Sequence, residues 1–324
     1  MKIRTAVLWK FSGIGTICLA LLGSNAAEAQ VKLEYKFPEG KKLSYKSTVK
    51  TKQILTLNGT EIETANDQAV VSTQTNGQKR GDSEIPVEEK VESLHLELSL
   101  PGGMSLTFDS SNPDAKIDNP MLEFLGEALK LASETRYTIV VGTQNKVKAI
   151  EGNEKNLEKA EKLSPQAKDL MHARLQPEKL KERFEQEHRN LPDVLARPGE
   201  SWERTETLDI SGGQILSFKK KYEYVGTEMK ENKTLDKIKS QVTEVELKQE
   251  GGGDSPFKVV KGNLKVAESE GTILFDREEG HVVNLKGKLR VTGDMMTYSI
   301  NGMEIPGSLD LTMETDTELQ TPKK

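Results

Sequence analysis

The stretch VESLHLELSL, residues 91–100, carries leucine at every second position from Leu94 to Leu100. Polar residues fill the positions between the leucines, so the segment has one apolar face and one polar face. This period of two is typical of a strand that is buried on one side and solvated on the other. Such strands belong to antiparallel sheets, because parallel strands covered on both faces are apolar throughout.

The same alternation recurs over residues 43–50, 283–291 and 309–314. The pairs Asn58-Gly59 and Asn301-Gly302 are typical of hairpin turns, since both residue types tolerate positive φ. The sequence therefore predicts an α+β fold built on a large, curved, mostly antiparallel sheet that resembles half a barrel.

Two helical segments interrupt the strands. Asn119-Pro120 is typical of a helix start, with asparagine as the cap and proline in the first turn. The apolar residues of 119–133 surround the helix axis, which predicts one buried helix against the apolar face of the sheet. Residues 153–190 have an amphipathic pattern broken by Pro165 and Pro177, and we expect this segment on the same face.

The charged residues of the second segment include Glu185, Glu187 and His188, which stand close together in the sequence. A metal or catalytic site is one interpretation of such a group. The surrounding sequence is rich in lysine and glutamate, which favours a solvated helix face instead.

Residues 1–29 have the pattern of a secretory signal peptide: a basic start, an apolar stretch and a small-residue motif. The motif is Ala27-Glu28-Ala29, so we expect cleavage after Ala29 and a mature chain that begins at Gln30. The apolar stretch is shorter than the ~20 residues that span a bilayer, so we expect no transmembrane anchor after cleavage. The mature protein is expected in the periplasm, elsewhere in the cell envelope or outside the cell.

The mature chain is expected to form a single α+β domain over residues 30–320, with a short tail at 321–324. Residues 30–152 would supply the first half of the sheet and the buried helix. Residues 153–192 would be helical, and residues 193–320 would supply the second half of the sheet.

The order of several short motifs resembles a family of uncharacterised exported bacterial proteins that share a domain of unknown function. The resemblance covers most of residues 31–320 and rests on GKKLSY (40–45), IEG (150–152), LP (191–192) and PGESW (198–202). The family has no established activity, so the resemblance implies no catalytic residue. The expected architecture also looks like the lipoprotein-carrier proteins of the periplasm, in which one curved sheet wraps around helices; this is an analogy of fold alone.

Composition and motifs argue against several classes of function. The chain has 51 acidic and 46 basic residues and a formal net charge of -5, so we expect no nucleic-acid partner. The single cysteine lies in the signal peptide, which leaves the mature chain without a thiol. The four histidines lack metal-ligand spacing, and there is no Gly-x-Ser-x-Gly elbow. We therefore expect a protein without catalytic residues, cofactor or metal.

The remaining hypotheses concern the apolar face of the sheet. If the few helices leave it partly uncovered, the protein binds an apolar ligand, such as a lipid or a lipidated protein, and Phe124, Leu125 and Leu129 line the site. If the face is filled, those residues belong to an ordinary core. A structural or protein-interaction module of the envelope is the alternative function, and a hydrolase with an unrecognised pair of acids is a third.

Overall fold

The computed structural model describes residues 30–81, 83–114, 117, 119–209, 214–249 and 257–320. The expected cleavage motif at Ala27 and Ala29 and the tail at 321–324 lie outside these described residues. Gln30, the expected first residue of the mature chain, is described and is exposed.

Twelve strands of the described chain form one sheet. The first six are β1 (Lys42–Leu57), β2 (Thr60–Asn76), β3 (Ile85–Leu100), β4 (Met104–Asp109), β5 (Arg136–Val141) and β6 (Val147–Glu151). The other six are β7 (Ser201–Asp209), β8 (Gln214–Lys230), β9 (Lys233–Gln249), β10 (Phe257–Asp276), β11 (His281–Ile300) and β12 (Met303–Leu319).

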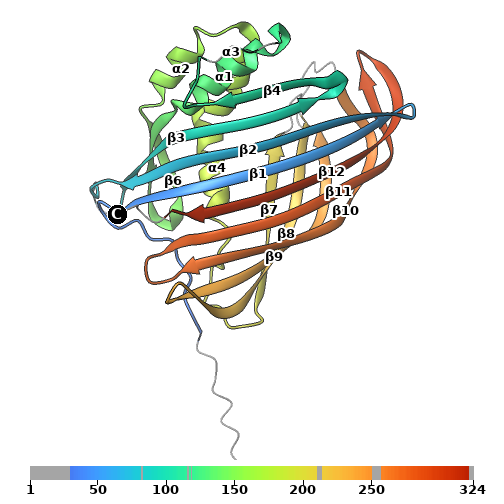
Figure 1. Cartoon of the computed structure of the whole chain (residues 1–324). Helices are drawn as coiled ribbons and strands as arrows, with labels where there is room; N and C mark the ends of the chain where they lie inside the picture. Colours follow the sequence, from blue (N-terminus) through green and yellow to red (C-terminus); the bar gives the residue numbers. More distant parts are fainter. Residues whose placement is uncertain are drawn as a thin grey trace, which may run out of the picture.

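The main path of the sheet runs β6-β5-β3-β2-β1-β12-β11-β10-β9-β8-β7, and every pairing is antiparallel. Strand β4 pairs with the second half of β3, whereas β5 pairs with its first half. The sheet curls as it proceeds, so that β7 and β8 pass behind β1 and β12 (Figure 1). The predicted α+β class and the curved antiparallel sheet are confirmed.

Two Asn-Gly pairs form the expected hairpin turns at the same end of the sheet. Asn58 and Gly59 have φ values of 49° and 81° between β1 and β2. Asn301 and Gly302 have nearly the same values, 50° and 82°, between β11 and β12. Both turns need positive φ at successive residues, which explains the residue types found there.

The described helices are α1 (Glu123–Ser133), α2 (Glu154–Ala160), α3 (Pro165–Leu175) and α4 (Pro177–Glu187). The Asn119 side chain accepts a hydrogen bond from the amide of Met121, as expected for a cap. Pro165 and Pro177 open α3 and α4, so the predicted breaks are confirmed. No described helix is long and apolar enough to cross a membrane.

Helices α1, α2 and α3 pack together beside β3 and β4, whereas α4 continues from the end of α3 into the curl and contacts β6 (Figure 1). The leucines of β3 point toward α1, and Leu94 and Leu96 are buried with Leu106, Phe108 and Leu122. The leucine strand therefore has the predicted buried face.

Further apolar clusters fill other parts of the curl. The N-terminal segment places Leu33 against Tyr222, Ile238 and Phe275 from the second half of the sheet. Elsewhere Phe218 and Val245 of β8 and β9 pack on Val291 of β11, so this part of the sheet folds back on itself.

The outer face of the central strands carries a lattice of ion pairs. Lys50 lies 2.8 Å from Asp67, and Arg290 lies 2.6 Å from Asp310. These pairs alternate along the strands with residues that face the inside of the curl, which keeps the outer face polar.

Candidate functional site

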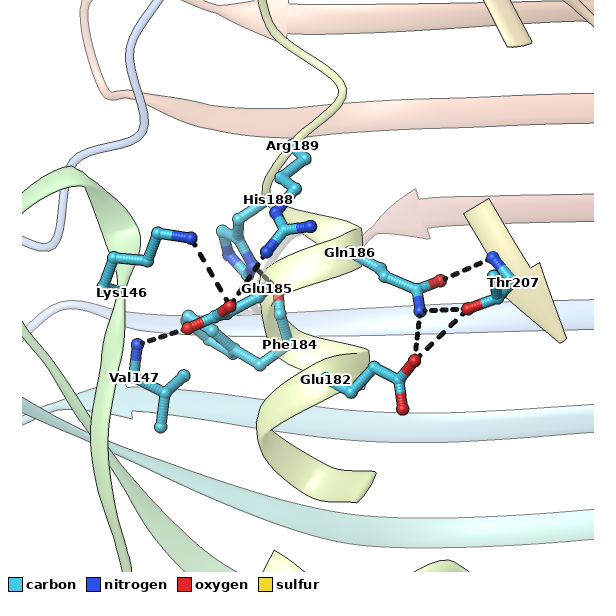
Figure 2. Close-up of polar contacts among 9 residues, drawn as sticks. All are labelled: Lys146, Val147, Glu182, Phe184, Glu185, Gln186, His188, Arg189 and Thr207. Carbon is cyan, nitrogen blue, oxygen red and sulfur yellow. Dashed lines mark hydrogen bonds and ion pairs between the residues drawn. The ribbon is translucent and has the colours of Figure 1, made fainter. Parts of the chain in front are cut away.

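Helix α4 lies between the two edge strands of the sheet, with β6 on one side and β7 on the other (Figure 2). On the β6 side, the backbone N–H of Val147 donates to Glu185 Oε1 at 3.0 Å. The other carboxylate oxygen lies 3.0 Å from Arg189 Nη2 and 3.7 Å from Lys146 Nζ. An edge amide that has no strand partner therefore receives an acceptor from the helix.

On the β7 side, Gln186 forms the corresponding hydrogen bonds with the edge strand. Its Nε2 donates to Thr207 Oγ1 at 3.1 Å, and its Oε1 accepts from the Thr207 amide at 3.4 Å (Figure 2). Thr207 Oγ1 also donates to Glu182 Oε1 at 3.2 Å. A polar hollow of about 520 Å³ remains between this side of α4 and β7, lined among others by Lys181 and Thr205.

The prediction of a solvated helix face is wrong for Glu185, which is only 9 % exposed. Burial raises the pKa of this carboxyl, but the Val147 hydrogen bond and the charges of Lys146 and Arg189 outweigh it and hold the pKa below its usual range. The helix turns this charge to the sheet edge because the edge offers an unpaired amide.

The inner side of α4 is anchored by apolar contacts. Leu180 and Phe184 are each 1 % exposed and pack among Val87, Ile139 and other buried residues of β3, β5 and β6. The ring of His188 stacks on Phe184 with centroids 4.0 Å apart, and burial lowers its pKa. The expectation of a solvated position is therefore wrong for His188 as well.

Beside this anchor lies a group of polar side chains from β3, β5, α3 and α4. We call them the inner polar cluster: Glu89, Tyr137, Arg174, Arg183 and Glu187. The Tyr137 hydroxyl donates to Glu89 Oε2 at 2.6 Å, and Arg183 in turn donates to the Tyr137 oxygen. Gln74 Nε2 donates to the second oxygen of Glu89 at 3.1 Å, so both oxygens of that carboxylate are bound.

The electrostatics of the inner polar cluster are unusual for two of its members. The surrounding protein and the charge of Glu89 raise the pKa of Glu187 to about 7. The Glu187 side chain is nevertheless accessible to water. It therefore changes its charge near neutral pH while in contact with water.

Arg174 is the second unusual member. The surrounding protein and the charge of Arg183 lower its pKa. Among the residues that the structure describes, no side chain forms an ion pair or hydrogen bond with Arg174. A guanidinium retains its charge at neutral pH, so two positive charges stand near each other, and the carboxylates of Glu187 and Glu89 act on Arg183.

Half-buried apolar residues continue from the inner polar cluster along the inner face. We call them the inner apolar wall: Val49, Val70, Val91, Leu98, Leu125 and Leu129. The main tertiary neighbours of β1, β2 and β12 are other strands, not helices. The inner face of β1, β2 and β12 is therefore less covered by helices than the part of β3 beneath α1.

The three candidate ligand-lining residues do not share one surface. Leu125 and Leu129 contact the leucines of β3 and belong to the inner apolar wall. Phe124 points the other way, into a cluster formed with α2 and α3 that includes Ala128, Leu131 and Met171. All three are half-buried. Helix α1 has apolar residues all around because it lies between two partners.

Sequence reasoning missed the residues of the inner polar cluster. Arg183 and Glu187 flank the apolar stripe of Leu180 and Phe184 at helical spacing, and this was the one local signal for their position. Their partners on β3 and β5 are remote in sequence. No group of three or more His, Cys, Asp or Glu suited to a metal ion occurs in the described part of the chain.

The comparisons with known proteins identify a family. Residues 82–282, more than half of the chain, match the family of unknown function DUF6263, so the chain belongs to that family. This bears out the resemblance to uncharacterised exported bacterial proteins. No curated protein matches the sequence.

Solved structures resemble the fold only distantly. A lipovitellin described for its lipid–protein interactions has 9% identity and a TM-score of 0.43, over 88% of this chain and 26% of that one. This chain thus spans about a quarter of that protein. A putative exported protein with a YmcC-like fold from Bacteroides fragilis has 9% identity and a TM-score of 0.21, over 87% and 98% of the two chains. A putative outer membrane lipoprotein-sorting protein domain from Vibrio parahaemolyticus has 8% identity and a TM-score of 0.12, over 86% and 87%.

Proposed function

We propose that this member of the DUF6263 family is an exported, non-catalytic protein of the cell envelope that binds an amphiphile on the inner face of its sheet. The observation that supports this most is the inner apolar wall, whose six residues remain half-buried although they lie inside the curl. Apolar side chains left partly uncovered on a concave surface are typical of ligand sites.

Export is supported by the pattern of residues 1–29, which combines a basic start, a short apolar stretch and Ala27-Glu28-Ala29. Intact-mass measurement of the protein recovered from its host should give a chain beginning at Gln30. A mass that retains Trp9 would contradict export by this route.

Binding is tested by titrating the delipidated protein with a fluorescent fatty acid. Val70 and Ala69 are neighbours on β2 whose side chains point to opposite faces, toward and away from the inner apolar wall. Val70→Asn should weaken binding at least about tenfold, equivalent to ~1.4 kcal/mol, because it places an amide against the acyl chain. Ala69→Asn, the matched control, should bind as the wild type does. Equal affinities, or no binding by the wild type, would contradict the proposal.

An acid-base function is the second candidate, because Glu187 has a pKa of about 7 and stands near the carboxylate of Glu89. Hydrolases use such a pair when one acid donates a proton and the other is free to accept one. Here both oxygens of Glu89 already accept hydrogen bonds from Tyr137 and Gln74, which favours a binding role. Ester hydrolysis that is abolished by Glu187→Gln would support the enzyme instead.

A further inference from the structure

We propose that Arg174 and Arg183 form the head-group site of the amphiphile and bind an oxyanion, a carboxylate or phosphate, at the end of its acyl chain. This rests on the proposed function, because the chain of the same ligand would lie on the inner apolar wall. Arginine suits such a group because its planar fork of N–H donors matches two oxygens at once.

The position of Arg174 is the first argument. Its guanidinium is accessible to water, yet it has no ion pair or hydrogen bond with any residue that the structure describes. Besides burial, the like charge of Arg183 lowers the pKa of Arg174. Two neighbouring positive charges repel each other, and an anion placed between them would relieve that repulsion.

The second argument is the arrangement of polar and apolar residues along the inner face. Glu89 of β3, which anchors the inner polar cluster, shares the strand face that carries Val91, Leu94 and Leu98 farther along. The distance from residue 89 to residue 98 along this strand is about 30 Å. A charged group at one end and apolar residues along the rest match the length and polarity of an amphiphile.

The third argument is Glu187, an acid near the two arginines that becomes neutral when it is protonated. Glu187 faces Glu89 on β3, Tyr137 on β5, Arg183 and His188 on α4, and Tyr35 of the N-terminal segment. Burial lowers the pKa of His188 and raises the pKa of both tyrosines, so these three groups are neutral at pH 7. When Glu187 is ionised, it competes with a ligand anion for the Arg183 guanidinium; when Glu187 is protonated, this competition ends. Binding should therefore weaken as pH rises through about 7.

The experiment compares ligands that share one acyl chain and differ in the head group: oleate, oleyl phosphate and oleyl alcohol. Wild-type protein should bind the two anions at least about tenfold more tightly than the alcohol, as expected for charge-assisted hydrogen bonds. Arg174→Gln should remove most of that preference and leave the affinity for oleyl alcohol unchanged. Lys46→Gln removes a charge of the same sign from the outer face of β1 and should change nothing.

Arg174→Gln removes no hydrogen bond or ion pair with any residue that the structure describes, so we expect this variant to fold. Its thermal midpoint without ligand should match or exceed that of the wild type. Arg183→Gln loses the bond to Tyr137, so a folding defect there would leave Arg174→Gln as the deciding variant. Glu187→Gln supplies the pH readout: between about pH 6 and pH 8 the wild type should lose affinity for oleate and this variant should lose less. The titration of oleate itself is common to both proteins.

The outcomes separate this inference from the proposed function. Equal affinity for oleate and oleyl alcohol in the wild type, or an unchanged preference in Arg174→Gln, would overturn the head-group site while the amphiphile proposal stands. Failure of all three amphiphiles to bind would overturn the proposed function as well. Inorganic phosphate that binds as tightly as oleyl phosphate would show a site for a free anion and would overturn the lipid assignment.

Discussion

The gap between strands β6 and β7 and the inner face of β1 and β2 both present sheet surface that needs a cover, and the protein covers the two regions differently. At the gap, side chains of α4 accept hydrogen bonds from backbone amides of both β6 and β7. Leu180 and Phe184 of the same helix are buried against β3, β5 and β6. On the inner face of β1 and β2, residues such as Val49 and Val70 stay half-buried. The comparison teaches that apolar packing is complete where α4 joins the two edges of the sheet and incomplete on the inner face of the central strands.

Removing Phe184 should have the largest effect on this comparison. Phe184→Ala should reduce the free energy of unfolding by about 3–5 kcal/mol, because a fully buried ring leaves a cavity. Leu129→Ala, on the half-buried inner apolar wall, should cost only about 1 kcal/mol, since less apolar area is lost. Denaturant unfolding of both variants measures the difference, and equal losses would mean that the wall is as well packed as the α4 anchor.

A smaller effect is expected at the edge contact. Glu185→Ala leaves the Val147 amide without its acceptor, which should cost about 1–3 kcal/mol. Glu178→Ala on the same helix is the control and should stay within about 0.5 kcal/mol. The exposed β6 edge should also promote self-association, visible in sedimentation. A Glu185→Ala protein that is monomeric and as stable as the wild type would show that the contact between Glu185 and β6 does not stabilise the position of α4.

The last effect concerns pH and the inner polar cluster. The pKa of Glu187 is raised in the folded protein from 4.5 to about 7, so its contribution to stability is complete below about pH 4.5 and is lost as pH rises toward 7. Glu187→Gln cannot ionise and should escape this loss, so its advantage in unfolding midpoint should grow between about pH 5 and pH 8. Parallel curves for the two proteins would mean that Glu187 is solvated like an ordinary surface acid.

The strands and the helix boundaries could be predicted from local sequence. Alternation in VESLHLELSL, the two Asn-Gly turns and the caps at Asn119, Pro165 and Pro177 depend on neighbours in the chain. These signals are local because side-chain period and turn geometry are set within a few residues.

The candidate site depends on contacts between distant segments, which explains what sequence reasoning missed. Arg183 meets Tyr137 across 46 positions, and Glu185 meets Val147 across 38. Which charged face of a helix turns inward is decided by the strand order that brings β6 and β7 to the edges. The same reason explains why Phe124 lies on a different surface from Leu125 and Leu129. The pattern predicted that α1 is enclosed, but not that one side packs on α2 and α3 and the other on β3.

The central claim is that the inner face holds an amphiphile, and native mass spectrometry of the protein purified without detergent from its own host tests it most directly. The wild type should carry a bound species that is released on activation and has the mass of an acyl-chain lipid. Val70→Asn should carry much less of it and Ala69→Asn the same amount. A wild-type protein that appears only at its bare mass, and that takes up no oleate when the fatty acid is added, would contradict the account.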